Sequence, residues 1–288
     1  MNRRLNEGLL SLPSFAWLFI FFLIPALMVL LISFRNADLY GGIAQGWSMS
    51  AYSSLNLSAY LGILWRTIWL SLATTAICLL LGIPVAFALA KLPPASQQAF
   101  LLLIIVPFWT NFLIRIYAWK ILLHPDGLVK QLLVGLHLIG EEATLLYNPI
   151  AVLAVLVYTY LPFAILPLYA AAEKFDFSLL EAGRDLGASP VRSFIKIFIP
   201  GISTGLLSAL LVVFIPALGS YIIPEIVGGP GGEMLGNKIA ERVFLERNLP
   251  KASALSSLLM LLILVPTIIS LRSGKGQNNF NSAMEDVF

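Results

Sequence analysis

Charged residues are scarce in this chain of 288 residues, and their scarcity decides the broad class of the protein. Only 11% of the residues are charged and 59% are hydrophobic, whereas a soluble domain carries about 25% charged residues. The 18 basic and 15 acidic residues nearly cancel, so no excess of positive charge indicates a nucleic-acid partner. We therefore expect lipid to be the solvent for most of the chain.

Residue types that disulfide, metal and hydrolytic chemistry require are also few. The single cysteine, Cys78, lies in an apolar run, which excludes an intrachain disulfide and predicts a packing role. The two histidines, His124 and His137, share one loop, and neither a His-Glu-x-x-His motif nor a Gly-x-Ser-x-Gly elbow occurs. These absences argue against a metal site and against an intramembrane enzyme.

The chain also lacks a Gly-x-x-x-x-Gly-Lys-Ser/Thr loop, the motif that cradles nucleotide phosphates. If ATP drives this protein, ATP and its magnesium must be bound by another polypeptide. No cofactor is expected on this chain.

Six apolar stretches without Asp, Glu, Lys or Arg are long enough to cross a bilayer. Each holds 20 or more residues, and a helical span needs about 20. Helices are expected because lipid satisfies no backbone hydrogen bond, and the alternation of barrel strands is absent. The sequence predicts an all-α integral membrane protein, a single domain over 1–288, in which the first run is a retained anchor. The predicted spans lie near residues 12–34, 67–90, 99–122, 149–171, 198–222 and 252–271.

Six spans place both termini on one side of the membrane. That side and the opposite side each receive nine Lys and Arg residues, so the count alone is a tie. The side with the termini has shorter segments, and Arg3 and Arg4 precede the first span. This density favours termini in the cytoplasm.

A polar segment between the fourth and fifth spans, residues 173–197, has the signals of a short helix. Ser178 and Glu181 have the spacing of a capping box, which predicts a helix that begins at Leu179. Gly187 stands where a left-handed C-terminal cap belongs.

The residues after this glycine predict a second helix. Ser189 and Pro190 are suited to the N-cap and first helical position of a helix that enters the fifth span. In the first helix, Leu179, Leu180 and Leu186 are expected on one face.

The spacing within this segment resembles the signature of ABC importer permeases. That signature reads Glu-Ala-Ala, three residues, Gly, nine residues, Ile-x-Leu-Pro; here Gly183 replaces the third Ala and Ile199 replaces Leu. The resemblance implies the type I importer permease fold, with a coupling helix that docks on a separate ATP-hydrolysing subunit. The residues assigned to ATPase coupling are Glu181, Ala182, Gly183, Asp185, Gly187, Ile197 and Pro200.

The same resemblance implies an assembly in a bacterial inner membrane. It contains a second homologous permease, two ABC ATPase subunits and a periplasmic or extracytoplasmic solute-binding protein. An ion-coupled secondary carrier is the rival class, but such carriers place an ionisable residue deep in a span. The predicted spans hold no Asp or Glu, which counts against that rival.

Two further segments, 107–117 and 221–229, resemble the first permease of spermidine/putrescine transport systems, with the putrescine type slightly closer. The resemblance covers roughly residues 60 to 270 and implies a polyamine as substrate. Relatives that move other small solutes share much of this pattern, so another small solute stays open.

A polyamine path requires carboxylates, carbonyl groups and aromatic faces. Glu225 is the leading candidate for a cation contact; the alternative is an interfacial Glu that pairs with Arg115 or is solvated. Thr110 and Asn111 are polar within the third predicted span and are expected to face protein. The aromatic candidates have interfacial anchoring or packing as their alternative. The substrate-path candidates are Glu225, Tyr221, Trp109, Asn111 and Tyr117.

Glycines gather after the fifth span, at Gly228, Gly229, Gly231 and Gly232, with Pro230 between them. This composition predicts a flexible external loop.

Overall fold

A computed structural model describes residues 12–38, 40–55, 57–264 and 267. The described residues belong to two compact units. Unit 1 is drawn from Met1–Gly62 and Lys238–Leu262, and unit 2 from Ile63–Asn237 and Ile263–Phe288. The single domain over 1–288 stays a prediction.

Unit 1 combines apolar helices with a short hairpin. Its first helix, Leu12–Ile32, includes the π-helical η1 (Phe19–Leu23) and α2 (Ile24–Ile32), and its most apolar window is not buried at all. Such a helix needs lipid or another subunit around it. The remaining elements are β1 (Arg35–Ala37), the antiparallel β2 (Ile43–Trp47), α3 (Ser50–Ser53), most of α14 (Leu235–Phe244) and an apolar helix, Leu249–Leu264.

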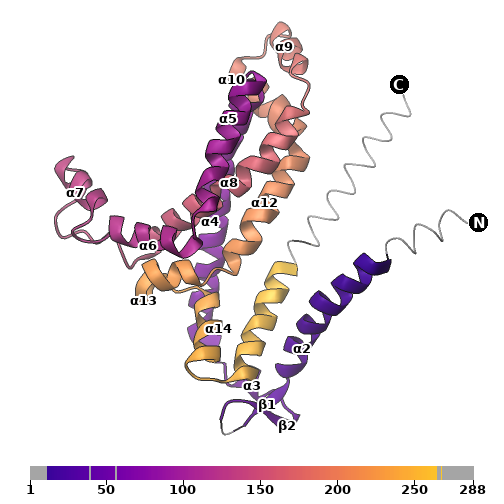
Figure 1. Ribbon diagram of the computed structural model, residues 1–288, viewed down its shortest axis with the longest axis vertical. Helices are drawn as coiled ribbons and strands as arrows, with labels where there is room; N and C mark the ends of the chain where they lie inside the picture. Colours follow the sequence, from indigo (N-terminus) through magenta and orange to yellow (C-terminus); the bar gives the residue numbers. More distant parts are fainter. Residues whose placement is uncertain (1–11, 39, 56, 265–266, 268–288) are drawn as a thin grey trace, which may run out of the picture. The chain divides into compact units, whose positions relative to one another are not determined.

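Unit 2 is a helical bundle in which α12 packs along α8. In Figure 1, α9 and α10 lie at one end of α5, α8 and α12, whereas α6 and α13 lie at the other end. Its elements are α4 (Leu57–Ala90, which begins in unit 1), α5 (Pro94–Ile105), η2 (Val106–Trp109), α6 (Phe112–Leu122), α7 (Leu128–Gly135), α8 (Pro149–Glu173), α9 (Ser178–Asp185), α10 (Pro190–Ser193), η3 (Phe194–Phe198), α11 (Ile199–Gly201), α12 (Ser203–Leu218), η4 (Pro224–Gly228) and α13 (Gly229–Gly232).

Three of the described helices are long and apolar enough to cross a membrane. They are Leu12–Ile32, Tyr60–Ala90 and Pro149–Glu173. Two bent pairs raise the number to five if each pair is one span. The sixth predicted span, 252–271, coincides in part with the shorter helix Leu249–Leu264, and its end lies outside the described residues. The structure therefore supports three to five of the six spans by length and composition.

The predicted start of the second span at residue 67 is wrong, because α4 begins at Leu57. Arg66 set the predicted boundary, but this residue lies inside the helix. Its guanidinium donates a hydrogen bond to the Glu233 carbonyl oxygen at 3.3 Å. A charged side chain with a protein partner does not have to end a helix near the membrane.

The third predicted span, 99–122, is not one continuous helix. Its two parts, Pro94–Trp109 and Phe112–Leu122, meet at an angle of 90°. Pro107 lies in the 3₁₀-helical η2, and Thr110 has an extended backbone with ψ of 148°. Because proline removes a backbone donor, the helix breaks at this point and restarts at Phe112.

The glycine-rich segment is not the flexible loop that its composition predicts. Residues 229–232 form the helical turn α13, which packs against α8. A Cβ atom on Gly228 or Gly232 would lie 2.8 or 3.0 Å from Val152 Cγ2. These glycines are required because the backbone approaches α8 closely.

Packing of α12 on α8 depends on a glycine in the same way. A Cβ atom on Gly205 would lie 2.4 Å from the Ala171 Cβ and 2.8 Å from the Pro167 carbonyl oxygen. Overpacking costs about 1–3 kcal/mol, and the better helix propensity of alanine offsets about 1 kcal/mol of this. We expect Gly205→Ala to lower the melting temperature of the purified subunit in detergent.

The matched control for this change is Gly62→Ala. Gly62 lies in the interior of α4, and no atom of another described segment lies within 4 Å of the position that a Cβ would take. This substitution should leave the melting temperature unchanged or raise it. Equal melting temperatures for Gly205→Ala and Gly62→Ala would contradict the close helix contact.

Candidate functional site

The first candidate site is centred on α9, which begins one residue earlier than predicted. The expected Ser178–Glu181 capping box does not form, because Ser178 is the first helical residue and not the N-cap. Instead, the Asp176 carboxylate accepts a hydrogen bond from the Ser178 backbone N–H at 3.0 Å. Hydrogen bonding from Ser178 lowers the pKa of Asp176, so this carboxyl stays ionised at neutral pH.

The C-terminal end of α9 is closed as the sequence predicts. Gly187 has a φ of 88°, in the left-handed region. Its N–H donates to the Arg184 carbonyl oxygen at 2.8 Å, and the Ala188 N–H donates to that of Gly183 at 3.0 Å. These two bonds satisfy carbonyl groups that the last helical turn leaves free.

The second helix also begins where it was predicted. The Ser189 Oγ accepts a hydrogen bond from the Arg192 N–H at 3.3 Å, and Pro190 is the first helical residue. The chain then passes through the π-helical turn η3 and bends by 73° between Gly201 and Ser203. The expected helix into the fifth span is therefore present, but it is bent where it meets α12.

The inner face of α9 packs against η3. Gly183 is buried, and a Cβ atom on it would lie 2.5 Å from the Ile197 Cδ1. The structure therefore brings together two of the residues assigned to coupling from the sequence. The departure from alanine at Gly183 has a packing reason here, because the smaller residue leaves room for the Ile197 side chain.

Five phenylalanines beneath α9 form a cluster that we call the aromatic base. Phe198 is fully buried at its centre, with ring centroids 4.8 Å from Phe87 and 5.2 Å from Phe175. Lys91, in the turn after α4, has its Nζ 4.2 Å from the Phe87 ring centroid. The members are Phe87, Phe175, Phe177, Phe194 and Phe198. Sequence reasoning missed this cluster because its members come from three separate segments.

The outer face of α9 is exposed. Leu186 is 90% exposed and Leu179 is 49% exposed, so two of the three leucines expected on one face of α9 are not buried. Only Leu180 is buried, in the core that includes the aromatic base. The exposed residues among those assigned to coupling are Glu181, Ala182, Asp185, Gly187 and Pro200. The helix thus offers both carboxylates and leucines on a supported surface.

The second candidate site lies where α6 packs against η4, at the opposite end of unit 2 from α9. Trp109 and Tyr117 are 78% and 52% exposed, and Tyr221 is 41% exposed. The Tyr221 carbonyl oxygen accepts a hydrogen bond from the Glu225 N–H at 3.0 Å. Among the described residues, no side-chain hydrogen bond or ring contact joins any two of the five predicted path residues.

Asn111 has a structural role that the sequence did not indicate. Its side chain accepts a hydrogen bond from the Leu113 N–H at 2.8 Å and caps α6. Thr110 and Asn111 are both exposed at the helix break, so the continuous span expected around them is absent. That they face protein stays a prediction.

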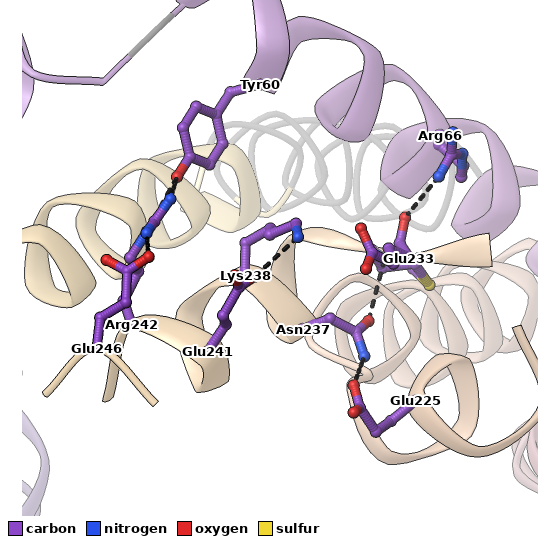
Figure 2. A network of polar contacts seen from close by, with 10 residues as sticks. Tyr60, Arg66, Glu225, Glu233, Asn237, Lys238, Glu241, Arg242 and Glu246 are labelled. Carbon is purple, nitrogen blue, oxygen red and sulfur yellow. Dashed lines mark hydrogen bonds and ion pairs between the residues drawn. The ribbon is translucent and has the colours of Figure 1, made fainter. Parts of the chain in front are cut away.

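Glu225 is exposed and has an amide partner. Its Oε2 accepts a hydrogen bond from the Asn237 Nδ2 at 2.7 Å (Figure 2). The alternative partner, Arg115, instead lies over two rings, with its Cζ 5.2 Å from the Phe108 centroid. The interpretation of Glu225 as an ion pair with Arg115 is therefore wrong. Sequence reasoning also missed Asn237, which carries no motif signal.

Comparisons with known proteins identify the family of the chain. Residues 73–274 match the family described as binding-protein-dependent transport system inner membrane component. The chain belongs to this family. It is thus a non-catalytic, membrane-spanning permease component of an ABC transporter.

Two named relatives extend over most of the permease. It is 37% identical to the spermidine/putrescine transport system permease protein PotB of Haemophilus influenzae, over 91% of each chain. It is 36% identical to the PotB of Escherichia coli, over 90% of this chain and 94% of that one.

Solved structures show the same fold at low sequence identity. The permease matches a chain of a bacterial alginate ABC transporter, in complex with an alginate-bound periplasmic protein, with a TM-score of 0.70. The match has 15% identity and covers 93% of both chains. It supports the all-helical ABC permease fold predicted from the sequence.

Proposed function

We propose that this permease forms the membrane path of an ATP-driven importer for polyamines such as spermidine and putrescine. The observation that carries the substrate class is the similarity of 36–37%, over at least nine-tenths of the chain, to permeases named for these two solutes. The exposed Glu225 carboxylate, with an amide as its partner, supplies the charge that an ammonium group needs. Another small solute is the second candidate, because the alginate transporter has the same fold.

The proposal assigns energy coupling to α9. A separate ABC ATPase subunit, which carries ATP and magnesium, binds the exposed face with Glu181, Ala182 and Asp185. The aromatic base and the Gly183–Ile197 contact support this role, since a helix fixed to its own bundle can transmit a rigid-body motion. The importer also contains a second homologous permease and a periplasmic solute-binding protein. Both termini and α9 lie on the cytoplasmic side of a bacterial inner membrane.

The test is uptake by the assembled importer in lipid vesicles. Labelled putrescine or spermidine is offered with its binding protein, with and without ATP inside the vesicles. We expect uptake that needs ATP and persists when ion gradients are collapsed. Uptake that follows a gradient without ATP would indicate a secondary carrier, and uptake of a different solute only would remove the polyamine assignment.

Replacement of Lys91 also tests the coupling site, with a smaller expected effect. Its Nζ lies over the Phe87 and Phe177 rings, and an exposed cation–π contact contributes about 0.5–1 kcal/mol. We expect Lys91→Met to lower the ratio of uptake to ATP hydrolysis by about twofold. Lys130→Met, in α7, is the control and should leave the ratio unchanged. An unchanged ratio in Lys91→Met would show that the aromatic base does not need this cation.

A further inference from the structure

Asn237 is a buried polar side chain whose hydrogen-bonding atoms are all engaged at the second candidate site. It is 6% exposed, at the start of α14. Its Oδ1 accepts from the Met234 N–H at 3.0 Å, and its Nδ2 donates to the Tyr221 carbonyl oxygen at 3.0 Å. The Nδ2 also donates to the Glu225 Oε2 at 2.7 Å (Figure 2). We propose that Asn237 is the positioning residue that holds the Glu225 carboxylate in place for the cationic solute. This inference rests on the proposed polyamine function.

The backbone around Asn237 is held from two sides within unit 2. The Leu235 N–H donates to the Thr67 Oγ1 of α4 at 2.8 Å. A Cβ atom on Gly236 would lie 2.7 Å from the Ser220 carbonyl oxygen, so this backbone lies directly on the end of α12. The amide group of Asn237 therefore has one fixed position, and it transmits that position to Glu225.

The chemistry of the Asn237 amide matters as much as its position. An amide N–H is a neutral donor, so it orients a carboxylate without cancelling its charge. A lysine or arginine at this place would form an ion pair and leave little charge for a solute. Within the part of the chain that the structure describes, no hydrogen bond reaches the Glu225 Oε1. This oxygen is the atom that we assign to the ammonium group.

Two arginines on helices that adjoin the second candidate site make printed contacts with groups other than Glu225. Arg115 of α6 lies over the rings of Phe108 and Phe112. Arg66 of α4 donates to the Glu233 backbone carbonyl oxygen. Lys120 of α6 also has its Nζ near other groups, 6.0 Å from the ring centroids of Tyr117 and Tyr147.

An isosteric change tests the positioning role. Asn237→Asp keeps the acceptor for Met234 but replaces the donor to Glu225 by a second carboxylate. Two carboxylates so close cannot both be ionised without repulsion, so one of them holds a proton until the pH rises. We expect polyamine uptake, relative to the parent protein at each pH, to fall about tenfold at pH 8 and much less at pH 5.5.

The double variant Asn237→Asp, Glu225→Gln exchanges the two groups. It restores one amide, one carboxylate and one negative charge to the pair. We expect it to lose the added pH dependence, because only one carboxylate remains, while uptake stays low at every pH, because that carboxylate stands at position 237 and not at 225. A purely structural role for Asn237 predicts the same pH profile for the double and the single variant, because the bond to the Tyr221 carbonyl is broken in both.

Two controls separate the possible outcomes. Asn248→Asp makes the same substitution at a residue whose side chain accepts from the Lys251 N–H in unit 1, and it should change uptake less than about twofold. Absence of polyamine uptake by the parent importer would overturn the proposed function itself. With the parent active, an Asn237→Asp variant that keeps the parent pH profile, or a double variant with the pH profile of the single one, would overturn the positioning role alone.

Discussion

Replacing Gly187 by valine is expected to separate ATP hydrolysis from solute uptake. Gly187 closes α9 with a φ of 88°, and a β-branched residue reaches this left-handed region only with strain of about 1–3 kcal/mol. The cap should open, and the exposed face of α9 should lose its fixed orientation. We expect uptake by the reconstituted importer to fall by more than about tenfold while ATP hydrolysis continues.

The matched control is Gly187→Asn, because asparagine adopts the left-handed conformation readily. Apart from the chain neighbours of Gly187, no described atom lies within 4 Å of the position that its Cβ would take. The added side-chain volume alone should therefore not destabilise this subunit. Near-normal uptake is expected for Gly187→Asn. If the valine and asparagine variants transport equally well, the turn does not carry the coupling function.

Replacing Glu225 by glutamine is expected to reduce polyamine uptake about tenfold at saturating binding protein. A charge-assisted hydrogen bond contributes about 1.5–3 kcal/mol, and exposure of Glu225 to solvent reduces that value. Glutamine can still accept the hydrogen bond from Asn237, so the local structure and the assembly of the subunit should persist. The measurement is the uptake rate of labelled putrescine, with the amount of assembled complex determined in parallel.

Glu241→Gln is the control for this change. Glu241 forms an ion pair with Lys238 at 2.7 Å in unit 1, and it is not among the residues assigned to the solute. Its replacement should alter uptake by less than about twofold. Unchanged uptake in Glu225→Gln would remove this carboxylate from the solute path and leave the remaining assignments intact.

Local signals allowed the coupling segment to be predicted in most of its detail. Gly187 and the Ser189–Pro190 pair act through their own backbone and close neighbours, so spacing alone located both helix boundaries. The N-terminal cap was assigned wrongly because the Asp176 carboxylate accepts from the Ser178 N–H, the donor that a capping box assigns to the Glu181 side chain. The two alternative hydrogen bonds have similar energies, so a sequence motif does not predict which of them forms.

Two other predictions failed because of contacts between distant segments. The start of α4 was misplaced because Arg66 finds a carbonyl partner 167 residues further along the chain. The glycine-rich turn was expected to be flexible because its contact with Val152 of α8 is invisible in composition. The aromatic base and Asn237 were missed for the same reason: their partners are determined by packing, not by spacing.

The hydrogen bond from the Asn237 amide to Glu225 also has a consequence for the rate of transport. A carboxylate that already had a lysine or arginine bound would have to break that ion pair each time a solute arrived, and would have to form it again on departure. In the role that we propose for Glu225, its hydrogen bond to Asn237 persists, so arrival and release exchange only water and ammonium at one oxygen. A weak, rapidly exchanging contact of this kind suits a passage better than a storage site, since tight retention would slow every turnover.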